Sequence, residues 1–291
     1  MSAEALPARA GGKRFLLIAV AMLAPMAIIN LASFLLPVLR LAQISFMESR
    51  SGGVLTGRYT FQSYTSFFSD TFSLDLIANS LALSLTVTLA TLLCAYPIAL
   101  FLHRVSPTWR NLLFVVTVSP LLVSAVVRTY GWMVILGDKG VVNGLLMSSG
   151  LISAPLRLTN NWFGVVIGLV EVLIPYMALS LIAGFGRLDL TLEEAAASLG
   201  ANSWTRFRRV VFPLTLPGVA LGSLLCFVLA ISSFITPKLL GGGRVFLLAT
   251  EIYDQAVVQL EWPKAAATSA IVLIIFGLAL ALYSRAVRRF E

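Results

Sequence analysis

The stretch LTLEEAAASLGANSWTRFRRVVFPLTLPG, from Leu190 to Gly218, is the most polar part of an otherwise apolar chain. It holds paired glutamates, an alanine run and several arginines, and it lies between two long apolar segments. Apolar segments of that length cross a bilayer as helices. We therefore expect the stretch to be a loop that a membrane protein presents to water.

The same stretch has the pattern of two short helices. Thr191 and Glu194 have the spacing of a capping box, in which each side chain bonds to the other residue's backbone N–H. Gly200 stands where a helix takes a left-handed terminating residue. A second helix is predicted from Ser203, and Pro213 is expected to end it. The first helix carries one apolar stripe, formed by Leu192, Ala195, Ala196 and Leu199. The prediction is a helix–glycine–helix hairpin whose shallow alanine face lets a partner approach closely.

Composition places the rest of the chain in a membrane. Of the 291 residues, 58% are hydrophobic and 12% are charged, whereas a soluble domain carries about 25% charged residues. The fold class predicted is an all-α membrane protein with six transmembrane helices and a cytoplasmic hairpin. The expected spans are Phe15–Ala42, Ser80–Leu102, Asn111–Leu136, Phe163–Phe185, Leu214–Thr236 and Ala265–Tyr283.

The distribution of Lys and Arg predicts the orientation. With the N-terminus inside, the cytoplasmic segments carry more than half of the 21 basic residues, as the positive-inside rule requires. Both termini are therefore expected in the cytoplasm. The domain organisation is then a cytoplasmic tail over residues 1–14 and one transmembrane domain over 15–291, with the hairpin at about 187–213. The net charge of +8 follows from this topology. The basic flanks of the spans are expected to contact anionic lipid headgroups, and no nucleic-acid partner is expected.

The hairpin also resembles a known signature. The matching positions are Glu194, Ala195, Ala196, Gly200, Val210, Phe212 and Pro213. They resemble the E-A-A signature of bacterial ABC importer permeases, with valine and phenylalanine in place of isoleucine and leucine. Ser119–Leu146, Phe234–Gly243 and Trp262–Ile275 are similar to segments of spermidine/putrescine-type permeases. By resemblance, the chain is identified as a member of the ABC importer permeases, which implies the type I permease fold.

The resemblance implies a mechanism and partners. In that family the hairpin is a coupling helix docked in a cytoplasmic ATPase, whose closure switches the permease between inward and outward access. The implied partners are an ABC ATPase dimer, a second homologous permease subunit and a periplasmic solute-binding protein, at the bacterial inner membrane. The implied solute is a polyamine or a related cationic or opine-like compound. The residues expected to couple to the ATPase are Glu193, Glu194, Ala195, Ala196, Gly200, Ala201, Phe207 and Pro213.

No cofactor is expected on this chain itself. The sequence has no G-x-x-x-x-G-K-S/T phosphate loop. ATP and Mg²⁺ are therefore expected on the partner ATPase, and this chain is expected not to be an enzyme.

Two charged residues fall within predicted spans, and such residues are candidates for a functional role. Arg128 and Glu171 are each about eight residues from the outer end of their span, so they are expected at matching depth. One interpretation is an ion pair that stabilises two adjacent helices. The other is that Glu171 faces the solute pathway and meets a cationic solute.

Aromatic residues gather near the outer halves of the spans. Tyr130, Trp132, Tyr176 and Phe234, together with Ser233, are candidates for the solute pathway. The aromatic residues are consistent with a cage for a cation or with an interfacial belt that contacts lipid headgroups.

Two rival functions remain to be weighed. An intramembrane hydrolase needs a nucleophile and a base within reach, and the sole histidine, His103, has no such pattern around it. A self-sufficient secondary transporter or channel is the better alternative, although such folds usually contain internal repeats and this sequence shows none. Dependence of transport on ATP distinguishes that alternative from an ABC importer.

Overall fold

Helix α7 (Trp162–Phe185) lies at the centre of the fold. The structure is a computed structural model that describes residues 11–50, 53–186 and 188–287. Apolar residues recur at every fourth position of α7 and form one buried stripe: Val165, Leu169, Leu173, Met177, Leu181 and Phe185. This spacing keeps them on one helix face. The stripe forms the core with α3 (Thr71–Arg104) and α10 (Phe212–Ser232), which contact both α7 and each other.

Two facing glycines allow α7 and α10 to approach closely. A Cβ atom built on Gly184 of α7 would lie 2.6 Å from the Cα of Gly218 on α10. One turn further along, a Cβ on Gly222 would lie 2.6 Å from the Sδ of Met177. Small residues at such crossings let helix backbones pack directly, which is a common way to join helices in a membrane.

The number of expected spans is only partly reproduced. Within the described residues, five helices are long and apolar enough to cross a membrane, and a sixth span exists only if one bent pair is counted. The five are α1 (Gly11–Ser45), α3, α7, the continuous helix Ser203–Ser232, and α13 (Trp262–Val287). The fold is thus mostly helical and apolar, as predicted, while the predicted N-terminal tail lies largely outside the described residues.

The predicted third span, Asn111–Leu136, is broken rather than straight. It consists of α4 (Pro107–Val118), the 3₁₀ turn η1 (Ser119–Leu122) and α5 (Ala125–Leu136). The segments on either side of the break meet at 97°. Pro120 has no backbone N–H to donate, and Val123 is extended, so the α-helical hydrogen bonds cannot continue.

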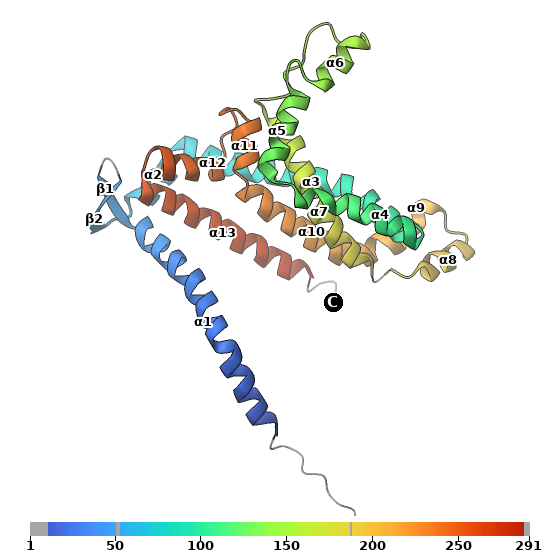
Figure 1. The fold of residues 1–291 in the computed structure, drawn as a ribbon, viewed down its shortest axis with the longest axis horizontal. Helices are drawn as coiled ribbons and strands as arrows, with labels where there is room; N and C mark the ends of the chain where they lie inside the picture. Colours follow the sequence, from blue (N-terminus) through green and yellow to red (C-terminus); the bar gives the residue numbers. More distant parts are fainter. Residues whose placement is uncertain (1–10, 51–52, 187, 288–291) are drawn as a thin grey trace, which may run out of the picture.

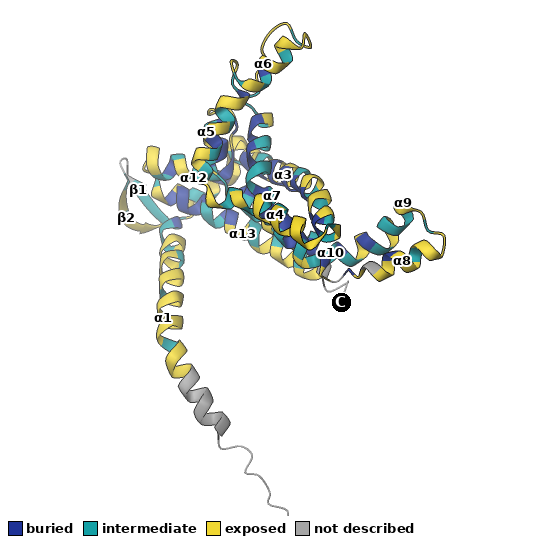
Figure 2. Ribbon diagram, turned by 45° about the vertical axis from the view of Figure 1, so that its right-hand side comes forward, coloured by how far each residue is buried: buried dark blue, intermediate teal, exposed yellow. Residues whose placement is uncertain are grey.

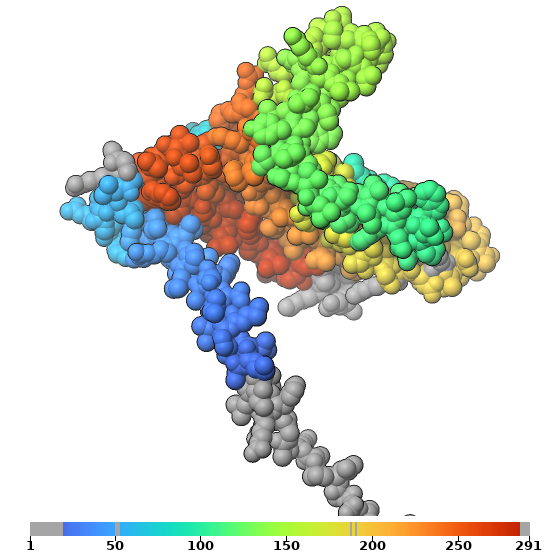
Figure 3. Space-filling model, viewed as in Figure 1, coloured from blue at the N-terminus to red at the C-terminus, as the bar shows by residue number. Residues whose placement is uncertain are grey.

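Two parts of the chain stand off the bundle (Figures 1 and 3). Helix α1 leaves at an angle and contacts the rest of the chain chiefly at α13. In Figure 2 the coloured part of α1, from Val20 onward, is mostly exposed, while buried residues gather where α3, α7 and α10 meet. On the other side, α5 and α6 (Val141–Ser148) form an arm that projects from the bundle.

The two ends of the bundle differ (Figure 1). One end, named the α8 end, carries α8 (Leu190–Ser198), α9 (Ser203–Arg206) and the π-helical turn η2 (Phe207–Val211). The opposite end, named the β end, carries an antiparallel β-hairpin that the all-α prediction did not include. Its elements are β1 (Met47–Arg50), β2 (Val54–Tyr59), α2 (Gln62–Ser69), α11 (Ile235–Leu240), α12 (Leu248–Tyr253) and the π-helical turn η3 (Asp254–Val258).

Candidate functional site

The N-cap of helix α8 lies two residues before the predicted one. Asp189 is the N-cap residue, and its carboxylate accepts a hydrogen bond of 2.9 Å from the backbone N–H of Thr191. The expected capping box of Thr191 and Glu194 is therefore wrong, because both residues lie inside the helix. The backbone hydrogen bond from Thr191 lowers the pKa of the Asp189 carboxyl below its usual value. A charged cap suits this position, since the first turn of a helix carries partial positive charge.

The end of α8 agrees with the prediction. Gly200 adopts a left-handed backbone with φ +83°. Its N–H donates to the carbonyl of Ala197 at 2.9 Å, and the N–H of Ala201 donates to the carbonyl of Ala196 at 3.0 Å. This pair of bonds is a Schellman motif. The chain reverses there, and Asn202 caps α9 by accepting a hydrogen bond of 2.8 Å from the N–H of Thr205.

The predicted apolar stripe of α8 is present and uncovered. Leu192 and Ala195 are exposed, Leu199 is 89% exposed, and Ala196 is partly exposed. Trp204 on α9 is also exposed beside them. Within the described residues, nothing in the chain packs over this face. An uncovered apolar face on a hairpin that projects from the bundle is typical of a docking surface.

The hairpin is held to the bundle by an ion pair. Nη2 of Arg104, the last residue of α3, donates to Oε2 of Glu193 at 2.7 Å. Glu193 is only 8% exposed, whereas Glu194 points to solvent. In the sequence, Arg104 is one of the cytoplasmic basic residues that predict the orientation, and its position at the end of a span is the one hint of this contact. The two neighbouring glutamates thus have different surroundings, one tying the hairpin to α3 and the other free at the surface.

A polar cavity lies behind the hairpin. It has a volume of about 350 Å³ and is lined by Leu100, Arg104, Glu193, Glu194, Ser203, Arg206 and Phe207. Within the part of the chain that the structure describes, Oε1 of Glu193 and Nε of Arg206 are buried and lack a hydrogen-bond partner. A buried polar group without a hydrogen-bond partner destabilises a fold, so these two groups have capacity to bond to a group from outside the chain.

Phe207 connects the hairpin to the bundle. Its ring stacks on Trp204 at 5.6 Å and meets Tyr96 of α3 edge-on at 5.7 Å. The expectation that Pro213 ends the second helix is wrong, because α9, η2 and α10 form one helix from Ser203 to Ser232. Pro213 lies in the first turn of α10, and the preceding π-helical turn adjusts the backbone hydrogen bonding around a residue with no N–H.

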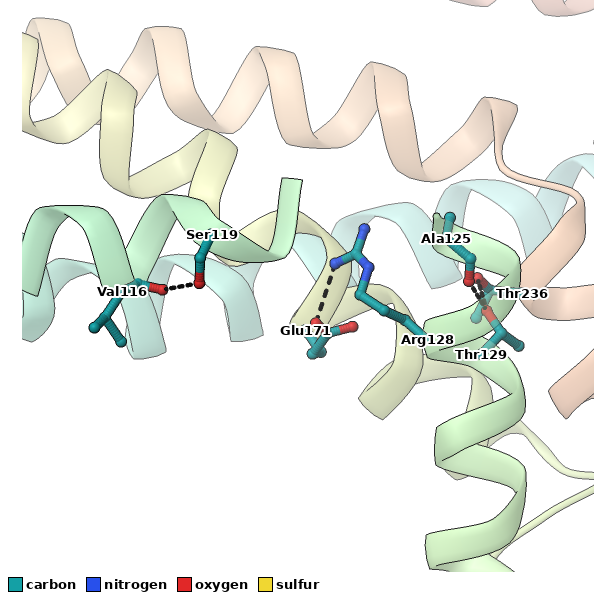
Figure 4. A network of polar contacts seen from close by, with 7 residues as sticks. All are labelled: Val116, Ser119, Ala125, Arg128, Thr129, Glu171 and Thr236. Atoms are coloured by element: carbon teal, nitrogen blue, oxygen red, sulfur yellow. Dashed lines mark hydrogen bonds and ion pairs between the residues drawn. The ribbon is translucent and has the colours of Figure 1, made fainter. Parts of the chain in front are cut away.

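The two charged residues of the predicted spans form an ion pair (Figure 4). Nη1 of Arg128, on α5, donates to Oε1 of Glu171, on α7, at 3.0 Å. Their side chains are 13% and 26% exposed, respectively. Nearby, the hydroxyls of Thr129 and Thr236 share a hydrogen bond of 3.1 Å that joins α5 to α11. The pair therefore braces the α5 arm against α7, which is the first of the two interpretations; a role for Glu171 toward a solute is untested by this contact.

The predicted aromatic residues are not gathered in one place. Tyr130 is exposed on the α5 arm, while Trp132 and Tyr176 pack against the core. Ser233 is partly exposed just after α10. Phe234 stacks instead on Tyr253 of α12, with ring centroids 5.4 Å apart. Among the described aromatic contacts, none joins two of the four residues that the cage interpretation combined.

Several named permeases align with this sequence over most of its length. The chain is 36% identical over 252 residues to the spermidine/putrescine transport system permease protein PotB of Haemophilus influenzae, covering 87% of this chain and 88% of that one. It is 34% identical over 253 residues to PotB of Escherichia coli, covering 87% and 92%. The inner membrane ABC transporter permease protein YdcU of Escherichia coli is 29% identical, covering 80% and 83%.

Solved structures agree on the fold, and a family match settles the class. A bacterial alginate ABC transporter, in complex with its alginate-bound periplasmic protein, has a chain with a TM-score of 0.76 at 20% identity, covering 95% of this chain and 96% of that one. A chain of the inward-facing MetNI methionine ABC transporter gives 0.54 at 14% identity, covering 75% and 95%. Residues 88–291 match the family described as "Binding-protein-dependent transport system inner membrane component". The chain therefore belongs to this family, the membrane-embedded permease subunits of ABC importers.

Proposed function

We propose that this permease imports a small cationic solute of the polyamine type. Its α8 hairpin docks on a separate ATPase and couples ATP hydrolysis there to transport. The relatives named for spermidine and putrescine, which match over 87% of the chain, support the solute class. The observation that carries the coupling role is the hairpin itself: its alanine and leucine face is uncovered, a left-handed glycine closes it, and an ion pair holds it to α3.

The hairpin bonds to α3 and continues into α10, so a movement of α8 acts on both helices. The bond between Glu193 and Arg104 links α8 to α3. Through α9 and η2 the hairpin continues without a break into α10. Because α3 and α10 both pack on α7, movement of α8 is expected to shift the three central helices together. Packed elements of this kind switch between discrete arrangements rather than deforming gradually.

Several partners follow from this proposal. ATP and Mg²⁺ belong to an ABC ATPase dimer that docks on the α8 end, which then lies in the cytoplasm with both termini. A periplasmic solute-binding protein docks on the β end, which carries β1 and β2. A second homologous permease subunit and membrane lipid cover the apolar surface of α1, which this chain leaves exposed. The positive-inside distribution of Lys and Arg supports this orientation.

The proposed solute pathway keeps the residues named from the sequence. Arg128, Tyr130, Trp132, Glu171, Tyr176, Ser233 and Phe234 remain its candidates. Glu171 has a free oxygen, since Oε2 is buried and has no partner among the described residues. A carboxylate that keeps one unsatisfied oxygen within a membrane span has capacity for a second cation.

ATP-driven uptake tests the proposal. The permease is reconstituted in liposomes with its ATPase, second permease and binding protein, with ATP inside and labelled spermidine outside. We expect uptake that needs both ATP and the binding protein. Uptake of the solute by this chain alone, without an ATPase, would instead establish a self-sufficient transporter. Uptake driven by ATP for a neutral solute but not for any polyamine would refute the solute class.

A further inference from the structure

Four residues at the β end form a small cluster around a lysine ammonium group. Nζ of Lys238, on α11, donates to both carboxylate oxygens of Asp254 at 2.5 and 2.7 Å. The same nitrogen lies 5.7 Å from the ring centroid of Tyr253. The ring of Tyr253 is stacked in turn on that of Phe234, with an interplanar angle of 15°. We name Phe234, Lys238, Tyr253 and Asp254 the ammonium cluster.

The cluster contains the groups that bind an alkylammonium ion. A carboxylate supplies charge-assisted hydrogen bonds, and an aromatic face attracts a cation within about 6 Å. The lysine end group is a primary ammonium on a methylene chain, which is the same chemical group as the end of an alkyl polyamine. The contacts of Lys238 therefore show how a primary ammonium group fits between Asp254 and Tyr253.

The lysine is held weakly enough to be displaced. The side chains of Lys238 and Asp254 are 40% and 31% exposed, respectively. An ion pair with that exposure contributes little to the stability of the fold. A solute ammonium can take the place of Lys238 without breaking the fold, while Lys238 swings into water.

A cavity beside the cluster suits the methylene segment that adjoins such an ammonium group. It has a volume of about 390 Å³ and an almost wholly apolar lining between α10, α12 and α13. Phe234 and Tyr253 line it together with Ile231, Ile252 and Phe276. The cavity thus opens next to the ring that faces the ammonium group. Methylene groups bind favourably to an apolar surface of this kind, because they are removed from water.

The carboxylate stands on a fixed base. Asp254 opens the π-helical turn η3, a feature found often at functional sites. The next residue, Gln255, donates to Glu251 at 2.9 Å and accepts from Thr268 of α13 at 3.0 Å. These bonds fix η3 against α13, so the position of Asp254 does not depend on its bond to Lys238.

We propose that Phe234, Tyr253 and Asp254 form a binding site for the primary ammonium end of the solute, and that Lys238 is the resident counter-ion that the solute displaces. This site rests on the proposed function for its ligand class. It also gives Phe234 a different aromatic partner from those that the sequence suggested, because Tyr253 follows it by 19 positions and no sequence pattern joins them.

Single and double variants test the site in the reconstituted complex. With Asp254→Asn, we expect ATP-driven uptake of spermidine to fall roughly ten-fold, since one charged hydrogen-bond acceptor is lost. With Lys238→Met, uptake rises, because the competing ammonium is gone. The double variant stays as low as Asp254→Asn. Glu261→Gln is the matched control: it changes a carboxylate at the same end that bonds to Ser49, outside the cluster, and leaves uptake unchanged.

A structural salt bridge gives the opposite pattern. Both single variants would then lose similar amounts of uptake and of complex yield, and the double variant would recover; that result overturns the proposal. So does an Asp254→Asn variant with the uptake of the wild type.

Binding without transport separates this site from the wider proposal. Thermal unfolding of the purified complex is measured with and without spermidine, for the wild type, Asp254→Asn and Lys238→Met. The site predicts a stabilising shift that Asp254→Asn abolishes and Lys238→Met enlarges. If that pattern holds but the wild type imports no polyamine, the site stands and the import proposal fails. If the shift is absent or unaffected by Asp254→Asn, the site fails whatever the complex transports.

Discussion

Replacing Gly200 with valine is expected to uncouple ATP hydrolysis from transport. Gly200 has φ +83°, and a Cβ atom built on it would meet nothing within 4 Å. The effect of a side chain is therefore conformational rather than steric. A left-handed backbone costs an L-residue about 1–2 kcal/mol, and a β-branched residue such as valine is a genuine outlier there.

The hairpin has little to oppose this cost. If the backbone at Gly200 relaxes, the two hydrogen bonds of the Schellman motif are lost, each contributing about 0.5–1.5 kcal/mol. Either way, one or two kcal/mol lowers the ratio of native to non-native hairpin by a factor of about 5–30. The buried contacts of α3, α7 and α10 lie elsewhere, so the bundle itself is expected to remain folded.

The assay compares uptake with ATP hydrolysis in the same proteoliposomes. Gly200→Val is expected to lower the solute imported per ATP by up to about 5–30-fold, the limit set by the shift in that ratio, with complex yield and thermal stability close to those of the wild type. Gly200→Asn is the matched control, because asparagine tolerates the left-handed region and should retain most of the coupling. If Gly200→Val imports solute at the full ATP-driven rate, the coupling assignment of the hairpin is wrong.

Three further predictions concern the contacts that hold the bundle. Glu193→Gln removes the charge that bonds to Arg104 at 2.7 Å; we expect lower uptake with intact span insertion, and equal uptake would show that this bond does not transmit movement. Gly184→Val places atoms within 3 Å of the facing backbone of α10, so we expect a drop in melting temperature in keeping with an overpacking cost of about 1–3 kcal/mol or more; an unchanged melting temperature contradicts this packing. Glu171→Gln removes the charge that pairs with the guanidinium of Arg128, and we expect uptake to fall more than complex assembly; equal losses in both measurements would leave only a structural role for the pair.

The apolar pattern predicted most of the helices, and local backbone chemistry explains the exceptions. Apolar length alone located α3, α7 and α13. The break between α4 and α5 was missed because Pro120 and Val123 lie in a largely apolar segment, where hydropathy cannot distinguish a bent helix from a straight one. The cap of α8 was misplaced because Asp189 and Thr191 are both good cap residues, and only the backbone geometry decides between them.

The site was predictable only where it is local in sequence. Gly200 and the exposed stripe follow from helix periodicity and termination within one segment. The bond between Arg104 and Glu193 joins residues 89 positions apart, and it depends on how α3 and the hairpin pack. The ammonium cluster is similar: the pairing of Lys238 with Asp254 requires the fold of α11 and η3, and no spacing rule suggests it.

The central claim is that the α8 hairpin is the surface on which the ATPase docks, and cysteine cross-linking tests it most directly. In a Cys94→Ser background, which removes the exposed native thiol, Leu199→Cys places a thiol on the exposed face of α8. Val54→Cys places one on the β-hairpin at the other end, where Val54 is 64% exposed. The account predicts a cross-link to the ATPase from Leu199→Cys alone, with a yield that changes when ATP binds. The absence of that cross-link in an assembled, ATP-hydrolysing complex, or an equal one from Val54→Cys, would contradict it.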